Sequence, residues 1–250
     1  MTNINHTKRE YDKFAEEYHK HLLDKKENRW HTYVEKPVMK NILKDIINNK
    51  IVLDLGCGSG IFTNELVKFK PNKIVGSDLS NGLINIAKKE YPKIKFCVCN
   101  AEKTIFKKNE FDVVTSSLMA HYFNDLIPLF KEVNRILKPK GNFIFSMHHP
   151  VMEVSGRLIV NGKTDKKNSL LKNYFKEGLY KWKLGKDMQN MIAYHHTFET
   201  IFNSLNKTGF IVENLFETKA VKKLYEINKE EYNRVMKRPS FLIIKASKIN

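Results

Sequence analysis

The sequence lacks the long apolar runs and the cysteine pairs that mark several large protein classes. No apolar stretch approaches the ~18 residues of a membrane-spanning helix, and residues 1–20 are polar and charged, without the apolar core of a secretory signal. The three cysteines, Cys57, Cys97 and Cys99, are too few for a disulfide framework and lack the second ligand pair of a zinc site. We therefore expect a cytoplasmic protein with no metal and no membrane contact.

Arginine is scarce in a chain that is otherwise strongly basic. The formal net charge is +17, but only 6 of the 44 basic residues are Arg, and the lysines are spread along the whole sequence. Arginine is the residue favoured for binding phosphates and bases through two parallel hydrogen bonds. Abundant Asn and Ile accompany the lysines, which indicates a coding bias and not a selected patch. Nucleic acid is therefore only the second candidate partner, behind a small molecule.

Strand-like and helix-like segments alternate in the first part of the chain. With 42% apolar and 28% charged residues, the 250-residue chain has the composition of a globular protein. The alternation is typical of right-handed crossover units around a parallel sheet. The expected strands are 51–55, 73–78, 93–98, 111–116 and 142–147, and the expected helices are 61–68, 81–90 and 126–137.

The flanking segments follow other patterns. Residues 7–48 are predicted to form helices, with Tyr11, Phe14 and Tyr18 on one helical face. Residues 151–193 hold scattered aromatics and few regular apolar runs, which predicts an insertion. A helix over 196–207, a strand over 210–216, a helical excursion over 221–236 and a last strand over 240–246 follow. We expect four parts: a helical lid (1–50), an α/β core (51–150), a cap insertion (151–193) and the rest of the core sheet (194–250).

A glycine-rich loop, Gly56-Cys57-Gly58-Ser59-Gly60, joins the first expected strand to the first expected helix. Such a loop presents backbone N–H groups and a helix N-terminus to a carboxylate or phosphate. Asp78 closes the second strand 20 residues after Gly58, where a carboxylate can accept hydrogen bonds from both hydroxyls of a ribose. The alternatives are a loop made only for chain reversal and an aspartate that caps the next helix. Together the two features predict an adenosine-type ligand.

Two nucleotide-binding fingerprints are missing. Ile61 occupies the position where a dinucleotide-binding loop needs its third glycine, and no Gly-Lys-Ser/Thr loop is present. The chain instead resembles the class I S-adenosylmethionine-dependent methyltransferases over residues 50–150. The resemblance rests on motif I (52–60), the ribose motif (76–80), Asn100-Ala101-Glu102 beside the adenine, the fourth-strand motif from Phe111 to His121, and the approach to strand five (136–142). Beyond residue 150, the chain is similar to a small-molecule branch near the ubiquinone and menaquinone methyltransferases.

The resemblance implies a fold, a cofactor and a set of binding residues. The implied fold class is α/β: a doubly wound, seven-stranded, mostly parallel sheet (Rossmann-like methyltransferase fold) with the last strand antiparallel and a helical cap. The implied cofactor is S-adenosyl-L-methionine. Asn100 departs from the family, where Asp is usual. The residues expected to bind the cofactor are Tyr11, Tyr33, Asp54, Gly56, Cys57, Gly58, Gly60, Asp78, Leu79, Asn100, Ala101, Glu102 and Ser116.

Methyl transfer from a sulfonium needs alignment of the reactants and, for a protonated nucleophile, a base. His148 and His149 follow the fifth strand, and His195 and His196 open the expected helix after the cap. A histidine titrates near neutral pH, so these four are the candidate catalytic residues, with His121 a weaker one. The alternative is that they are helix caps or structural donors. The aromatic face of Tyr11, Phe14 and Tyr18 is interpreted either as core or as a lid over the sulfonium.

The expected reaction is methyl transfer to oxygen or carbon of a small molecule by a monomer or homodimer. The net charge of about +5 over residues 151–193 suggests an anionic acceptor. The residues at the end of the fourth strand are Ser116-Ser117-Leu118-Met119. A Pro-Pro-aromatic tetrapeptide at this place would resemble the site of enzymes that methylate planar amino groups, and the chain does not have one. This departure disfavours an RNA or DNA methyltransferase. The remaining alternative is a non-catalytic S-adenosylmethionine-binding module.

Overall fold

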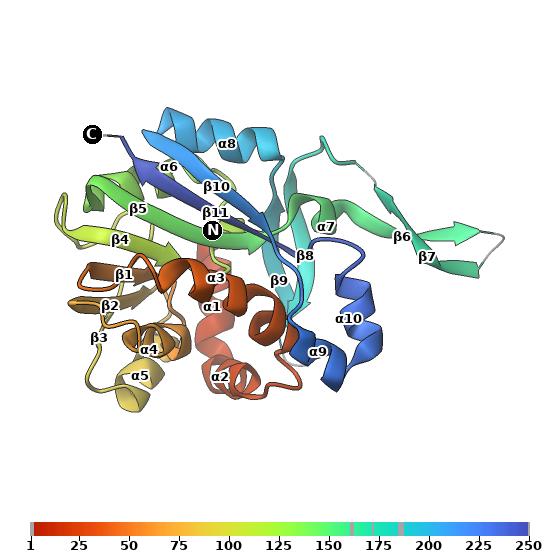
Figure 1. Cartoon of the computed structure of the whole chain (residues 1–250), viewed down its shortest axis with the longest axis horizontal. Helices are drawn as coiled ribbons and strands as arrows, with labels where there is room; N and C mark the ends of the chain where they lie inside the picture. The colour runs from red at the N-terminus through yellow and green to blue at the C-terminus, as the bar shows by residue number, and fades with distance from the viewer. Residues whose placement is uncertain (1–2, 161–162, 172, 185–187, 250) are drawn as a thin grey trace.

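The computed structural model describes residues 3–160, 163–171, 173–184 and 188–249, and it gives the backbone alone for residues 3, 153, 155–160 and 163–171. A seven-stranded sheet in the order β10-β11-β5-β4-β1-β2-β3 forms the centre of the molecule (Figure 1). Within the described ranges, no helix has the length and apolar character needed to cross a bilayer. The strands are β1 (Ile51–Leu55), β2 (Lys73–Asp78), β3 (Lys95–Val98), β4 (Phe111–Ser116), β5 (Leu137–His148), β10 (Phe210–Glu217) and β11 (Phe241–Lys248).

The pairing confirms the expected doubly wound topology. Strands β3, β2, β1, β4 and β5 are mutually parallel, so their carboxyl ends meet at one edge of the sheet. The last strand, β11, lies between β5 and β10 and is antiparallel to both. In an open α/β sheet, ligands bind in the crevice outside the carboxyl ends of the parallel strands. The topology therefore locates the functional edge before any side chain is considered.

Alternating side chains on the strands build two hydrophobic layers. On β5, Phe143 and Phe145 join one buried cluster, whereas Ile144 between them joins the cluster on the opposite face. The first cluster is covered by α6 (Leu126–Ile136) and α8 (Phe198–Lys207), and the second by α3 (Lys36–Leu43) and α4 (Ile61–Val67). Helix α5 (Asn81–Glu90) packs on β2 and β3. The continuous apolar runs in the sequence thus reflect strands that are buried on both faces.

The N-terminal segment is helical but interrupted. Helix α1 (Asn3–Lys13) ends just before Phe14, and α2 (Ala15–Leu23) follows it, so the expected aromatic face spans two helices. Tyr11 and Tyr18 nevertheless meet edge to face, with ring centroids 5.0 Å apart. A five-residue π-helix, His31–Glu35, then leads into α3. This π-helix is a structural feature that the apolar spacing did not predict.

Residues 151–193 form a short helix and two hairpins. Helix α7 (Pro150–Val154) leads into β6 (Ser155–Val160) and β7 (Lys163–Leu171), which pair as an arm that projects from the body (Figure 1). Strands β8 (Gly178–Leu184) and β9 (Met188–His195) form the second hairpin, which packs against α1. The sequence predicted an insertion here but not its β-structure. The side chains of 155–171, which carry much of the expected positive charge, lie outside the described residues.

The C-terminal elements differ from the sequence prediction in their details. Helix α8 begins at Phe198 and not at His196, because Thr197 caps it by accepting a hydrogen bond from the Thr200 N–H. The helical excursion consists of two short helices, α9 (Lys222–Ile227) and α10 (Lys229–Val235). The Val221 N–H donates to the Tyr33 carbonyl oxygen and so connects this excursion to the π-helix.

Candidate functional site

A cavity of about 100 Å³ lies at the carboxyl ends of β1, β2 and β4. Its floor is the strand ends and the loops that follow them, and its cover is α1 and α2 of the N-terminal segment. The lining therefore combines segments that are far apart in the sequence. Residues lining it include Ile4, Thr7, Tyr11, Tyr18, His31, Leu55, Gly56, Gly58, Asp78, Leu79, Leu83, Ala101, Ser117, Leu118, Met119 and Tyr122.

Asp78, at the end of β2, is fixed by the backbone around it. Its Oδ2 accepts from the Gly58 N–H at 2.8 Å, and its Oδ1 accepts from the Ser80 N–H at 2.9 Å. Burial raises the pKa of Asp78, while these backbone hydrogen bonds act in the opposite direction. Each carboxylate oxygen keeps further acceptor capacity toward the cavity that the residue lines.

The glycines of the loop have backbone conformations that favour glycine. Gly56, Gly58 and Gly60 have φ values of +78°, +56° and +79°. A Cβ atom on Gly60 would lie 2.7 Å from Cζ of Phe96, so this glycine also allows a close approach. The loop therefore places its backbone directly against the cavity and against the neighbouring strand.

Asp54, two residues before the loop, is almost fully buried. Its Oδ2 accepts from the Thr63 hydroxyl at 2.6 Å, whereas its Oδ1 is buried without a hydrogen-bond partner among the described residues. Burial, as the largest cause, raises the pKa of Asp54 to about 7. The side chain is thus a buried carboxyl group with unused acceptor capacity next to the glycine loop.

Three tyrosines cover the cavity. The hydroxyl groups of Tyr11 and Tyr122 are 2.7 Å apart, and the Tyr11 ring contacts those of both Tyr18 and Tyr122 edge to face. Burial raises the pKa of all three phenols well above the usual value, so they stay protonated. Asp12 connects helix α1, which carries Tyr11, to the segment after β2, since its Oδ1 accepts from the Ser80 hydroxyl at 2.6 Å and from the Gly82 N–H at 3.1 Å.

The residues expected to bind the cofactor divide into three groups. Six line the cavity: Tyr11, Gly56, Gly58, Asp78, Leu79 and Ala101. Six others are not among its lining residues but are neighbours of lining residues along the chain or in the glycine loop: Asp54, Cys57, Gly60, Asn100, Glu102 and Ser116. Asn100 uses its side-chain oxygen to accept from the Glu102 N–H at 2.9 Å. Tyr33 lies elsewhere and packs with Val34, Ala220 and Leu224.

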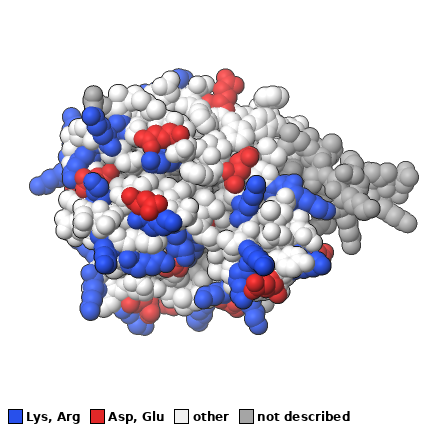
Figure 2. Space-filling model, viewed as in Figure 1, with Lys and Arg blue, Asp and Glu red and all other residues white. Residues whose placement is uncertain are grey.

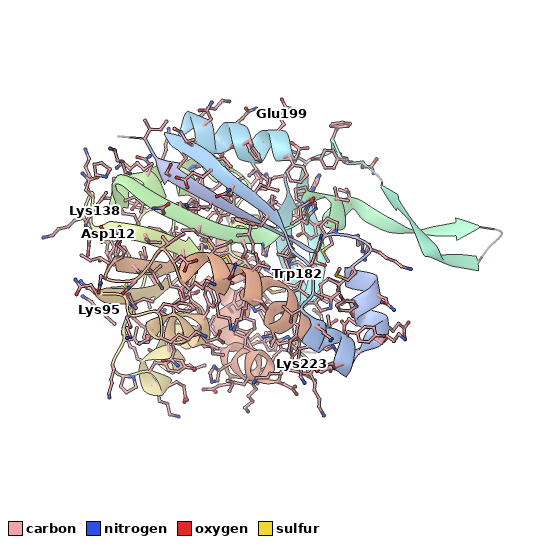
Figure 3. The ribbon with its side chains drawn as sticks, viewed as in Figure 1. Lys95, Asp112, Lys138, Trp182, Glu199 and Lys223 are labelled. Atoms are coloured by element: carbon pink, nitrogen blue, oxygen red, sulfur yellow. The ribbon has the colours of Figure 1, made fainter. Side chains whose placement is uncertain are left out.

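A second cavity, of about 500 Å³, adjoins the first and shares lining residues with it. The shared residues are Tyr11, Tyr18, His31, Leu118 and Tyr122. Most of the remaining lining is made of rings from other elements, including Trp30, His121, His148, Tyr180, Trp182 and Phe241. Trp182, on β8, lies in the region between the sheet edge and α9 (Figure 3).

The four candidate catalytic histidines have different surroundings. His148, at the end of β5, lines the larger cavity, stacks on His121 with ring centroids 3.8 Å apart, and contacts the Tyr180 hydroxyl at 2.6 Å through Nδ1. Burial lowers its pKa to about 4. The other three do not line either cavity. His149 Nε2 is 3.1 Å from Glu217, while the Nε2 atoms of His195 and His196 are each 2.8 Å from a carbonyl oxygen, of Tyr174 and Phe123 respectively.

Sequence reasoning missed several lining residues. Tyr122, Tyr180 and Trp182 carried no motif, and His31 was not considered, because the turns that bring them together are set by tertiary packing. His121 was a weak candidate, yet its ring lies within the larger cavity lining. Three ring nitrogens of residues in this lining, Trp182 Nε1, His121 Nε2 and His31 Nε2, are buried without a hydrogen-bond partner among the described residues. Burial without a partner is a signal that only the structure can provide.

The smaller cavity suits S-adenosylmethionine. Asp78 supplies a carboxylate for ribose hydroxyls, and the positive-φ glycines let a ligand approach the backbone closely. The faces of Tyr11 and Tyr18 supply electron-rich surface for a sulfonium cation. The donor set therefore fits the cofactor that the sequence motifs imply.

Comparisons with known proteins agree with this fit. A family model described as a methyltransferase domain matches residues 53–145. An uncharacterised protein of Haemophilus influenzae is 30% identical over 227 residues, which cover 86% of this chain and 87% of that protein. A crystal structure of an S-adenosylmethionine-dependent methyltransferase from Mesorhizobium loti has a TM-score of 0.73 at 28% identity and covers 85% of this chain and 96% of that one.

A demethylmenaquinone methyltransferase of Chlorobaculum tepidum is 33% identical over 115 residues, which cover 46% of this chain and 47% of that protein. The similarity to this named relative thus spans less than half of either chain. The fold, the cavity at the carboxyl edge and the longer matches all lead to one conclusion. The chain belongs to the S-adenosylmethionine-dependent methyltransferases of Rossmann-like fold, and S-adenosylmethionine is its methyl donor.

Proposed function

We propose that this enzyme methylates oxygen or carbon of a small, ring-containing acceptor that binds in the larger cavity. The observation that carries the proposal is the shared wall. Five residues line both cavities, so a molecule in the larger one lies next to the cofactor. The larger cavity is lined by several aromatic and imidazole rings, which favour a flat partner through stacking and edge contacts.

The acceptor chemistry follows from two unpaired donors. The backbone N–H of His148 donates to Nδ1 of His121 at 3.5 Å, so the ring proton of neutral His121 is on Nε2. Nε2 of His121 and Nε1 of Trp182 are then two buried N–H donors without partners among the described residues. An unsatisfied buried donor costs ~1–3 kcal/mol, and a ligand oxygen removes that cost. The proposed acceptor therefore carries a carbonyl, enol or phenol oxygen.

The charge of the acceptor is less restricted. Among the described lining residues of the larger cavity, Lys183 is one cation and Glu27 one anion. Burial keeps His31 and His148 uncharged at neutral pH, since it lowers their pKa values to about 3 and about 4. An anionic group on the acceptor, as the cap charge suggests, would have Lys183 as its partner.

The face of the molecule in Figure 2 gives no comparable support to a nucleic-acid acceptor. On the face in Figure 2, basic side chains are interspersed with acidic ones and do not form a continuous stripe. The larger cavity, with its rings and its two donors that have no partner among the described residues, is the feature that favours a ligand. Menaquinone-type precursors belong to the proposed acceptor class, in line with the Chlorobaculum relative.

The test is a transfer assay with a panel of acceptors. Purified protein is incubated with methyl-tritiated S-adenosylmethionine and with naphthoquinols, catechols, hydroxybenzoates, a free fatty acid or total tRNA. We expect labelled product only from ring-containing hydroxyl or enol compounds. Trp182→Phe, which removes one donor but keeps a ring, should raise KM for such an acceptor and leave the affinity for S-adenosylhomocysteine unchanged. Labelling of tRNA, or of the fatty acid alone, would refute the proposal.

A further inference from the structure

His31 occupies the wall between the two cavities, where a methyl group must pass from donor to acceptor. Of the five residues that line both cavities, one is leucine and three are tyrosines whose pKa values burial raises well above the usual value. Those phenols cannot act as bases near neutral pH. His31 is the remaining shared residue, and its imidazole is neutral there, because burial lowers its pKa to about 3.

Glu35 lies behind His31 and is completely buried. Its Oε2 is 3.9 Å from Nε2 of His31, and neither atom has a hydrogen-bond partner among the described residues. The other oxygen, Oε1, accepts from the hydroxyls of Ser117 at 2.9 Å and Ser146 at 2.6 Å. These serines follow β4 and lie in β5, so the carboxyl group is anchored to the central sheet.

The π-helix brings the two side chains together. His31 and Glu35 are its first and last residues. Single π-turns inside helical segments are rare and are frequently found at functional sites. The His31 side chain is 15% exposed, and its buried nitrogen is Nε2, which leaves Nδ1 as the nitrogen that a cavity ligand can reach.

We propose that Nδ1 of His31 accepts the proton of the methyl acceptor and that Glu35 is the positioning residue that keeps the other ring proton on Nε2. This inference rests on the proposed function. The acceptor O–H bond breaks, its proton forms a bond with Nδ1, and the oxygen forms a bond to the methyl carbon as the sulfonium sulfur keeps the electron pair of the broken S–C bond. The imidazolium then faces Glu35 and releases its proton to water, which restores the enzyme.

Burial, the largest cause, and the charges of Lys36, His21 and His148 all lower the pKa of His31. Burial also raises the pKa of Glu35, which stands opposite the ring. Lys36 itself is paired with Glu65 at 3.4 Å. A carboxylate that accepts from a ring N–H fixes the tautomer and stabilises the imidazolium as it forms. The 3.9 Å separation between Glu35 Oε2 and His31 Nε2 is longer than a hydrogen bond, and catalytic hydrogen bonds often tighten only in the reacting complex.

The first test reads the tautomer and needs no acceptor. Protein with ¹⁵N-labelled histidine is bound to sinefungin and titrated by NMR. We expect His31 to remain neutral at about pH 5, with the proton on Nε2 and none on Nδ1. Glu35→Gln should produce a tautomer mixture, whereas Glu132→Gln, a buried glutamate that accepts from Thr104, should not change the His31 signals. A proton on Nδ1 in the parent protein overturns the proposal.

The second test follows a proton that leaves a probe. The probe is 4-nitrophenol, added to protein with sinefungin bound. Its binding is measured by quenching of the fluorescence of Trp30 and Trp182, which both line the larger cavity. Ionisation of the bound probe is measured by the visible absorbance of its phenolate. Because Nδ1 of neutral His31 accepts from the hydroxyl of the un-ionised probe and so stabilises that form, bound probe should ionise at higher pH in the parent protein and in His6→Asn than in His31→Asn. His6 is a suitable control because its Nε2 contacts the Asn190 carbonyl oxygen on β9. Equal ionisation in His31→Asn and the parent overturns the proposal.

Turnover separates this inference from the proposed function. Turnover is compared at saturating S-adenosylmethionine, because His31 also lines the smaller cavity. For an acceptor found in the panel, His31→Asn should then lower kcat ~10²-fold or more, and Glu35→Gln at least ~10-fold. A panel without any labelled product contradicts the proposed function, and the tautomer experiment still decides the role of His31. Unchanged kcat in His31→Asn refutes the inference and leaves the proposed function standing.

Discussion

Replacing Asp78 by alanine should weaken cofactor binding far more than it weakens the fold. Both carboxylate oxygens already accept one backbone N–H, from Gly58 and Ser80, and are thereby held in place. Each retains acceptor capacity toward the cavity for one ribose hydroxyl. Hydrogen bonds to a charged group contribute ~1.5–3 kcal/mol net, which corresponds to a roughly 10–150-fold weaker Kd for S-adenosylmethionine.

A matched control separates the lost ribose contact from a general loss of order. Asp112, on β4, also accepts from a backbone N–H, that of Ile51 at 2.8 Å, and pairs with Lys138 at 2.9 Å. It lies on the other side of the molecule from Trp182 (Figure 3). Calorimetry with S-adenosylhomocysteine should show a weaker Kd for Asp78→Ala and a near-parent Kd for Asp112→Ala. Equal affinities in Asp78→Ala and the parent would mean that the ribose binds elsewhere.

Three further predictions concern the loop, the buried acid and the histidines. Gly60→Ala places a Cβ within 2.7 Å of Phe96 and should lower the unfolding free energy by ~1–3 kcal/mol, which a lower Tm would show. A Tm equal to that of the parent protein would contradict this prediction. Because the pKa of Asp54 is raised to about 7, the unfolding free energy in urea should fall as pH rises from about 4 to about 7 and then level off, and Asp54→Asn should flatten that slope. His148→Ala, which removes a ring that lines the larger cavity and stacks on His121, should raise KM for the acceptor, whereas His195→Ala and His196→Ala should cost ~1–3 kcal/mol of stability without a comparable rise in KM. Equal KM in all three variants would remove His148 from the proposed acceptor pocket.

The core of the fold was predictable because its signals are local. A buried parallel strand is a short apolar run, and a crossover helix follows it, so the order of elements from β1 to β5 can be read from the sequence. The glycine loop and Asp78 can also be recognised in the sequence, since the position of each depends on the strand that it follows or ends. The structure confirms the predicted order of strands and helices in the core sheet, including the antiparallel last strand.

The N-terminal and cap regions were less predictable, because tertiary contacts decide their form. The aromatic spacing of residues 11–18 suits one helix, but the chain turns at Phe14 and still brings Tyr11 against Tyr18. The π-helix depends on the anchoring of Glu35 by two distant serines. In residues 151–193, only part of the β-structure has a period-2 signal. Tyr180-Lys181-Trp182-Lys183-Leu184 of β8 alternates apolar and polar residues, a signal that the sequence analysis missed, whereas most of β7 is polar.

The same distinction explains why the sequence indicated the smaller cavity, where we expect the cofactor, and not the larger one, which we propose for the acceptor. The floor of the smaller cavity comes from loops that directly follow parallel strands, and each loop carries its own motif. The larger cavity is made by the N-terminal helices, the π-helix, the turn at His121, the end of β5, the β8 hairpin and the start of β11, with lining residues from Tyr11 to Phe241. Its lining residues interact across those segments, as His148 does with His121 and Tyr180. A change in any one segment can therefore reshape the acceptor pocket while the strand ends stay as they are. On this account, proteins that share the core motifs with this enzyme need not share its acceptor, and the rings around His31 and His148 are the positions to compare.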